Sequence, residues 1–110
     1  MTHELVVLVT TSTRDEAAAI AEALVSERLA ACVNIVAAIE SIYRWEGNVT
    51  RDSEALMIIK TTEERYPELE RRVKELHRYS SPEVVALRID RGSEQYLNWL
   101  RDSTVNDETR

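Results

Sequence analysis

The chain has 110 residues, of which 44% are hydrophobic and 31% are charged, and its formal net charge is −6. This composition is typical of one soluble globular domain and excludes a disordered chain. Because basic residues alternate with acidic ones instead of forming a patch, it also excludes a nucleic-acid-binding surface. We expect a single domain over 1–110, with an ordered core over 4–103 and a polar tail over 104–110.

The sequence contains one cysteine, Cys32, so no internal disulfide can form. The first apolar run, residues 5–9, is too short for the core of a signal peptide or for a membrane span. We therefore expect a cytoplasmic protein without membrane insertion. The sequence has no CxxC, HExxH or paired-histidine motif, so a metal site would have to be assembled by the fold.

The first predicted elements are a buried strand over residues 5–9 and a helix after it. Thr13 and Glu16 have the spacing of a capping box, in which a hydroxyl and a carboxylate satisfy the first amides of a helix. The helix should end near residues 27–29. Its apolar positions recur at steps of three and four residues: Ala17, Ile20, Ala21, Leu24 and Val25.

The next two strands, over residues 31–43 and 49–61, are predicted to form a long antiparallel hairpin. The polar stretch between them contains Glu46 and Gly47, and glycine after an acidic residue between two strands favours a tight turn. The hairpin is apolar on both faces at its base, where Cys32 and Lys60 stand among apolar side chains.

Residues 61–64 offer a cap for a second helix, with Leu69, Val73 and Leu76 as its apolar stripe. Three pairs at i,i+4 spacing indicate a solvated opposite face: Glu68 with Arg72, Glu70 with Lys74, and Arg71 with Glu75. Pro82 precedes a fourth strand over 84–89. The residues Gly92 and Ser93 then introduce a short final helix that carries Trp99, a packing residue.

The predicted order of elements is therefore βαββαβ followed by an extra helix. This order is typical of the α+β ferredoxin-like fold, a two-layer sandwich with both main helices on one face of an antiparallel sheet. A sheet with one wet face should alternate apolar and polar side chains, but these strands do not. Because leaving a whole apolar face wet forgoes more free energy than a domain's net stability, we expect a homo-oligomer.

Several ordered blocks carry a resemblance that extends from residue 5 to residue 104. These blocks are residues 31–35, 41–47, 56–61, 76–79, 82–84 and 96–100. On these blocks the chain resembles the CutA divalent-cation-tolerance family. The resemblance implies a cytoplasmic ferredoxin-like homotrimer linked to tolerance of divalent metals, especially copper. It also implies a cleft between subunits like that of nitrogen-regulatory signalling proteins, and it brings no established chemical reaction.

The chain departs from the family pattern in two places. Ala37 and Ala38 stand where such proteins often carry Pro-Gly, and residues 77–80 read His-Arg-Tyr-Ser where His-Pro-Tyr-Glu or a close variant is usual. The second departure removes a carboxylate beside His77, which weakens a metal site there.

The candidate metal ligands are Cys32, His77 and Glu83. A cysteine thiolate suits copper, and with histidine it also suits zinc, but a free cysteine is more often a small buried side chain. His77 stands at the end of the second helix, where an imidazole is either a ligand or a favourable helix terminus. No obligatory cofactor is expected; copper or another divalent metal is the expected ligand.

A second candidate site is a ligand cleft formed by Tyr43, Trp45, Lys60, Tyr79 and Glu83. Lys60 follows four apolar residues inside a strand, so its ammonium needs a carboxylate, and we expect Glu83 to supply it within one chain or across a subunit boundary. A structural ion pair and an anchor for an anionic ligand both fit this pair. The aromatic residues would line the cleft or pack an interface.

Three classes of function follow. The first is a non-enzymatic trimer that binds or responds to metal, and the alternative is a small-metabolite sensor that uses the same cleft and is read by an unidentified signalling partner. The third is an enzyme for acyl-phosphate hydrolysis, which the same fold supports. Because neither Gly47 nor Gly92 opens a main helix, the phosphate-binding loop of such an enzyme is missing, and we expect no catalysis.

Overall fold

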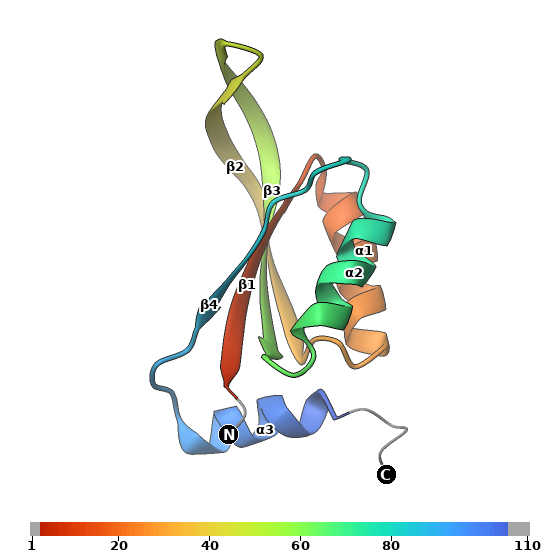
Figure 1. The fold of residues 1–110 in the computed structure, drawn as a ribbon, viewed down its shortest axis with the longest axis vertical. Helices are drawn as coiled ribbons and strands as arrows, with labels where there is room; N and C mark the ends of the chain where they lie inside the picture. The colour runs from red at the N-terminus through yellow and green to blue at the C-terminus, as the bar shows by residue number, and fades with distance from the viewer. Residues whose placement is uncertain (1–2, 106–110) are drawn as a thin grey trace.

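The computed structural model of the chain describes residues 3–105. Four strands form one antiparallel sheet in the order β2-β3-β1-β4, with two helices on one face (Figure 1). This arrangement confirms the α+β ferredoxin-like fold with a long hairpin and an added helix. The elements are β1 (Glu4–Thr11), α1 (Arg14–Ser26), β2 (Cys32–Trp45), β3 (Asn48–Thr62), α2 (Tyr66–Leu76), β4 (Val84–Arg88) and α3 (Glu94–Ser103).

The start of α1 has the predicted cap, with one change of partner. The Thr13 hydroxyl accepts a hydrogen bond of 3.1 Å from the Glu16 amide, while the Glu16 carboxylate accepts from the amide and the hydroxyl of Ser12. The prediction for Val25 was wrong, since this side chain is 43% exposed. Successive helical residues are about 100° apart around the axis, so Val25 lies at the edge of the stripe that Leu24 buries.

The β2–β3 hairpin turns at Glu46 and Gly47, whose φ angles of 49° and 81° are both positive. Two positive φ angles at the centre of a two-residue connection define a type I′ turn, which matches the twist of antiparallel strands. We call the far part of the hairpin, from Ile39 to Glu54, the arm. It extends well beyond the rest of the sheet (Figure 1). The molecule is therefore 48 Å long but only 22 Å thick.

A β-bulge interrupts β2 between Val36 and Ile39. Val36 lies opposite Leu56 and Ile39 lies opposite Glu54, so three steps along β2 match two along β3. Ala37 and Ala38, one of the two departures from the family pattern, stand in this bulge. Because side chains alternate between faces with a period of two, the extra residue reverses the faces of every later residue of β2.

Helix α2 begins later than predicted. Its first residue is Tyr66 and its N-cap, Arg65, makes no side-chain cap hydrogen bond, whereas the Thr62 hydroxyl only accepts from the Arg65 amide at 3.4 Å in the preceding turn. The reason is Pro67. Had the helix begun directly after Thr62, Pro67 would lie beyond the first turn, where its missing N–H breaks a helical hydrogen bond.

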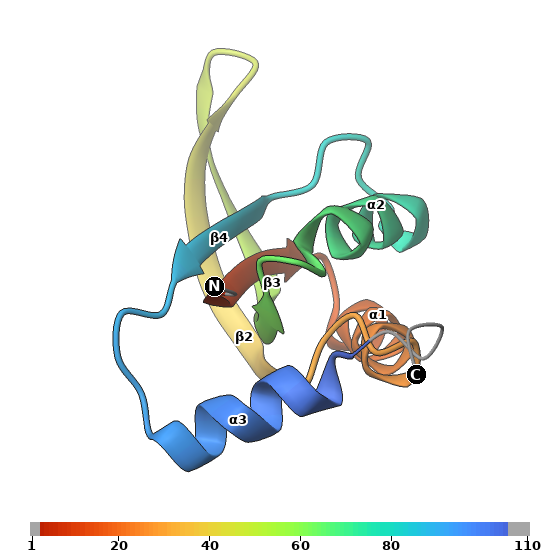
Figure 2. The ribbon, with the colours of Figure 1, turned by 60° about the horizontal axis from the view of Figure 1, so that its bottom comes forward.

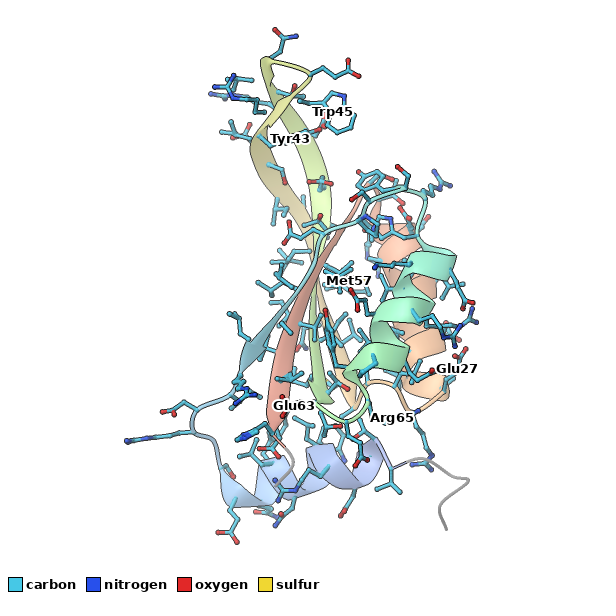
Figure 3. All side chains as sticks on the ribbon, in the orientation of Figure 1. Glu27, Tyr43, Trp45, Met57, Glu63 and Arg65 are labelled. Carbon is cyan, nitrogen blue, oxygen red and sulfur yellow. The ribbon has the colours of Figure 1, made fainter. Side chains whose placement is uncertain are left out.

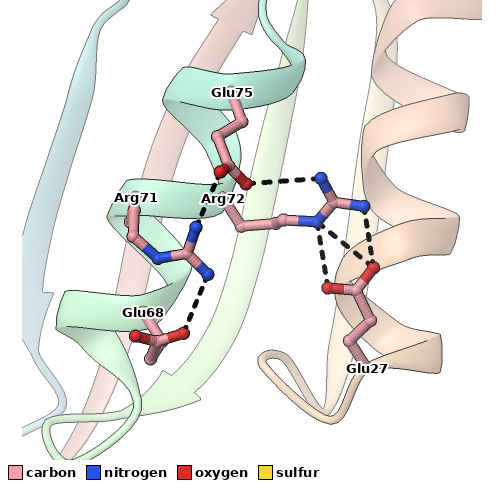
Figure 4. Close-up of polar contacts among 5 residues, drawn as sticks. All are labelled: Glu27, Glu68, Arg71, Arg72 and Glu75. Carbon is pink, nitrogen blue, oxygen red and sulfur yellow. Dashed lines mark hydrogen bonds and ion pairs between the residues drawn. The ribbon is translucent and has the colours of Figure 1, made fainter.

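The charged face of α2 confirms two predicted pairs and corrects the third. Arg71 pairs with Glu75 at 2.7 Å, and Lys74 pairs with Glu70 at 3.4 Å. Glu68 bonds Arg71 instead of Arg72, and the Arg72 guanidinium reaches across to Glu27 at the end of α1 (Figure 4). The charged side chains of α2 therefore link α2 to α1, and they also keep the outer face of α2 in contact with water.

The core lies between the sheet and helices α1 and α2. Its fully buried side chains include Val7, Val9, Leu24, Met57 and Ile59. Figure 2 shows α1 and α2 on the same side of the sheet, with α3 beyond the end of the sheet. There Arg101 of α3 pairs with Glu4 of β1 at 2.7 Å.

The opposite face of the sheet carries apolar side chains that the rest of the described chain, residues 3–105, leaves exposed. Val36, Val85 and Leu87 are 41%, 48% and 58% exposed. The prediction that a lone subunit leaves an apolar sheet face exposed is therefore confirmed. Among residues 3–105, no helix has the length and apolar character needed to span a membrane.

Candidate functional site

A cleft of about 760 Å³ lies where the arm of the hairpin meets the segment 79–83 that leads into β4. Four of the five residues predicted for a ligand cleft line it, namely Tyr43, Trp45, Tyr79 and Glu83. Figure 3 shows Tyr43 and Trp45 projecting from the arm. The other lining residues are Thr10, Ser41, Ile42, Asp52, Glu54, Ser80 and Ser81.

The bulge in β2 places the arm's side chains in this cleft. Beyond the bulge, Ser41 lies opposite Asp52 and Tyr43 lies opposite Thr50. Directly opposed residues of an antiparallel pair share one face, so Ser41 and Tyr43 lie on the same face as Asp52 and Glu54. An uninterrupted alternation from Cys32 would have turned Tyr43 to the other face.

Two tyrosine–carboxylate hydrogen bonds organise the cleft. The Tyr43 hydroxyl donates to Asp52, and the Tyr79 hydroxyl donates to Glu54 at 3.0 Å. The bond to Asp52, with a smaller contribution from burial, raises the pKa of Tyr43. Burial and the bond to Glu54 raise the pKa of Tyr79 to about 12. Both phenols are therefore held as neutral donors whose protons are already committed to carboxylates.

His77 is buried directly behind the cleft and uses both ring nitrogens. Its Nε2 lies 2.7 Å from the carbonyl oxygen of Thr10, and its Nδ1 accepts a hydrogen bond of 3.0 Å from the Tyr79 amide. Because Nδ1 accepts, Nε2 carries the proton and donates. The imidazole thus ties the end of α2 to β1 and fixes the position of Tyr79, whose ring centroid lies 4.8 Å away.

Glu16 supports the same segment from α1. Its carboxylate accepts from the Arg78 amide at 2.9 Å and lies 3.6 Å from Nδ1 of His77. Burial alone would raise the pKa of this carboxyl group, but the hydrogen bonds from Arg78 and Ser12 outweigh it and lower the pKa. These contacts favour the interpretation of His77 as a helix terminus.

Lys60 and Cys32 lie together at the other end of the sheet. They are directly opposed on β3 and β2, with Lys60 Nζ 3.8 Å from Cys32 Sγ and hydrogen-bonded to Asn34. Cys32 is partly exposed. Tyr96 of α3 also lies close to it: burial raises the pKa of Tyr96, and so does a hydrogen bond with Cys32.

The predicted pairing of Lys60 with Glu83 is wrong within one chain. β3 and β4 run in the same direction on either side of β1, so Lys60, near the end of β3, and Glu83, just before β4, lie at opposite ends of the sheet. Lys60 is partly exposed, and Asn34 and Cys32 supply its polar contacts. Lys60 is therefore not part of the cleft, contrary to the prediction.

The predicted metal ligands do not converge within one subunit. His77 contacts Thr10, whereas Cys32 lies at the level of Val6, four residues away along β1, a distance of about 13 Å. In the part of the chain that the structure describes, no three side chains of His, Cys, Asp or Glu are grouped so that they could hold a metal ion.

Sequence reasoning missed the acidic side of the cleft, Asp52 and Glu54. Both stand in the polar half of a strand, where charged residues are typical of a solvated surface. Their spacing of two residues was the available signal, because it places both carboxylates on one face of β3.

The chain matches the family described as "CutA1 divalent ion tolerance protein" over residues 5–103. The divalent-cation tolerance protein CutA of Thermus thermophilus is 54% identical over 101 residues, which cover 92% of this chain and 98% of that protein. The chloroplastic CutA protein of Arabidopsis thaliana is 50% identical over 93% of this chain, which spans only 56% of that longer protein.

Solved structures agree with these sequence matches. The structure of the divalent cation tolerance protein from Thermus thermophilus superposes with a TM-score of 0.91 at 54% identity, covering 93% of this chain and 99% of the other. A CutA from Archaeoglobus fulgidus, described as a periplasmic divalent cation tolerance protein, superposes with a TM-score of 0.90 at 35% identity, again over 93% and 99%.

Proposed function

Because the chain belongs to the CutA1 divalent ion tolerance family, we propose that it is a non-enzymatic homotrimer that serves in tolerance of, or response to, divalent metals, copper in particular. It binds metal or a small ligand in clefts between its subunits, and it acts in the cytoplasm. No obligatory cofactor is part of this proposal.

The observation that carries the proposal is the exposed apolar face of the sheet beside the cleft. Val36, Val85 and Leu87 lie on this face, where a monomer would leave them in water. Exposed apolar patches of this kind mark association surfaces, and copies of one chain usually assemble with closed symmetry. The number three follows from the family resemblance, and the neighbouring cleft then lies at a seam between copies.

Light scattering at micromolar concentration tests the assembly. The expected mass is three times the 12.6 kDa of one chain. A stable solitary chain at this concentration would contradict the proposal, because the apolar face would then be exposed without a partner.

Metal binding requires ligands from more than one subunit. Cys32, His77 and Glu83 remain our candidates, and His77 would have to give up its bond from the Tyr79 amide to coordinate through Nδ1. Isothermal titration of copper into the wild-type protein and Cys32→Ala tests this site. Equal, weak affinity in both proteins would remove Cys32 from it.

The alternative function is a small-metabolite sensor that uses the same cleft and is read by a signalling partner. The three aromatic side chains that line the cleft favour it, because apolar walls with a few polar groups are typical of ligand sites. Quenching of tryptophan fluorescence across a panel of metabolites tests it, with Trp45→Phe separating the signal of the cleft from that of Trp99. A flat response to every metabolite would count against it.

We propose that the protein is not an enzyme because neither of its two glycines stands where a phosphate-binding loop would need one. Gly47 stands in the hairpin turn and Gly92 precedes α3, so neither opens α1 or α2. Phosphate transfer on this fold needs backbone amides around the phosphate at such a helix start. Hydrolysis of acetyl phosphate by the purified protein would overturn this part of the proposal.

A further inference from the structure

We propose that the cleft between the arm and segment 79–83 binds an extended organic cation of the aliphatic diamine or polyamine class, held by Asp52, Glu54 and Glu83 between the rings of Tyr43 and Trp45. The inference rests on the proposed role of the cleft as the ligand site and names the ligand class.

The charge of the lining is the first argument. The residues that line the cleft include three carboxylates and no Lys, Arg or His. Arg51, the nearest basic residue along β3, pairs with Glu40, which is not among the lining residues. A cation entering the cleft gains attraction from all three carboxylates, whereas an anion meets repulsion from each.

The hydrogen-bonding groups point to a ligand rich in donors. Tyr43 and Tyr79 already donate their hydroxyl protons to Asp52 and Glu54. Each carboxylate has about four lone-pair sites, so it can accept further hydrogen bonds after the one from tyrosine. The carboxylates therefore offer acceptors to the protons of an ammonium group, and the hydroxyls of Thr10, Ser41, Ser80 and Ser81 can accept from it as well.

The spread of the carboxylates favours an extended cation over a metal ion. Asp52 and Glu54 are two residues apart on one strand, so their Cα atoms are about 6–7 Å apart. They do not form part of any three-ligand group that could hold a metal ion among residues 3–105. Separate carboxylates along a cleft match ammonium groups separated by a short alkyl chain.

The aromatic rings supply the remaining part of the site. In the single chain Tyr43, Trp45 and Tyr79 are 39%, 63% and 39% exposed, so their rings are available to a ligand or a neighbouring copy at the cleft. Aromatic faces attract ammonium groups and also cover methylene carbons, and tryptophan is the strongest of the three in this role. Carboxylates beside such rings form a site for an amine with an apolar body.

Isothermal titration of the assembled protein with putrescine and spermidine tests the proposal. We expect saturable binding that Glu54→Gln and Asp52→Asn each weaken by about fivefold or more, because each removes one attractive charge while keeping the tyrosine's acceptor oxygen. Glu22→Gln is the matched control: the same change, at an exposed position of α1 outside the cleft, is expected to leave the affinity unchanged.

The control also separates specific binding from general attraction to a protein of net charge −6. If Glu22→Gln weakens spermidine binding as much as Glu54→Gln does, the amine binds through overall charge and the proposal is wrong. If neither amine binds but copper or an anionic metabolite quenches Trp45, only the ligand class named here fails. If no probe of either charge affects Trp45 or produces binding heat, the ligand-site function fails as well.

Discussion

Tyr79, in the segment after α2, donates a hydrogen bond of 3.0 Å to Glu54 on the arm of the hairpin. The two residues are 25 positions apart in the sequence, and their contact fixes one wall of the cleft against the other. His77 holds the same segment from behind through the Tyr79 amide. The width of the cleft therefore depends on a small set of polar contacts.

The raised pKa of Tyr79 predicts a dependence of stability on alkaline pH. Its folded pKa of about 12 lies above the ordinary value of 10.0. Below pH 10 the phenol is protonated in both states, and its stabilising contribution is fully present. As the pH rises from 10 toward about 12, the unfolded chain loses this proton first, so the contribution is lost.

Absorbance of tyrosinate, recorded while circular dichroism verifies the fold, measures this titration. Tyr79→Phe should remove the part of the tyrosinate absorbance change that occurs near pH 12. Tyr66→Phe is the control, because burial raises the pKa of Tyr66 without a bond to Glu54. An unchanged high-pH portion in Tyr79→Phe would show that another tyrosine produces it.

The ion pair between Arg72 and Glu27 predicts unequal effects of neighbouring arginines. Arg72 joins α2 to α1 through bonds of 3.0–3.2 Å, whereas Arg71 bonds only residues of its own helix. We expect Arg72→Ala to lower the melting temperature by about 3 °C and Arg71→Ala by about 1 °C or less. Equal shifts in a thermal melt would mean that the link between the helices contributes nothing beyond surface charge.

The apolar face predicts a charge-sensitive assembly. Leu87 is 58% exposed in the single chain, and in the proposed trimer it is covered by another copy. Leu87→Glu would bury an unpaired carboxylate at the interface. We therefore expect the trimer of this variant to dissociate at protein concentrations about tenfold or more above those at which the wild-type trimer dissociates. Sedimentation measures this shift, and Ala19→Glu on the exposed side of α1 should leave it unchanged.

The hairpin turn predicts two substitutions of opposite sign. Glu46 adopts a positive φ that favours Asn or Gly, so Glu46→Asn should stabilise the fold by about 0.5–1 kcal/mol. Gly47 has space for a methyl group but a φ of 81°, so Gly47→Ala should destabilise it by about 1–2 kcal/mol through backbone strain alone. Urea unfolding measures both, and a neutral Gly47→Ala would contradict the assignment of a type I′ turn.

Strand and helix patterns in the sequence were sufficient for most of the fold. The cap at Thr13 and the glycine at 47 produce local structure that depends on few distant contacts, and the apolar run over residues 5–9 fits a strand that pairs on both sides. The start of α2 was missed because the cap at Thr62 competes with Pro67, and the ring of proline decides the outcome.

The candidate site was harder to predict because it depends on register. Ala37 and Ala38 contain no turn signal, yet they form the bulge that turns Tyr43 toward Asp52 and Glu54. The pairing of Lys60 with Glu83 was chosen from charge alone, whereas the directions of β3 and β4 separate the two residues. Asp52 and Glu54 were not predicted as cleft residues, because their tyrosine partners come from β2 and from the segment after α2.

The bulge in β2 also limits how the arm can change in evolution. A single residue inserted or deleted between Ile39 and Tyr43 would turn Tyr43 and Trp45 to the other face of the arm, although the strands could still pair. Matched gains or losses of two residues on each strand would preserve their orientation. The arm can therefore become longer or shorter in steps of two residues on each strand while its aromatic side chains keep facing the cleft.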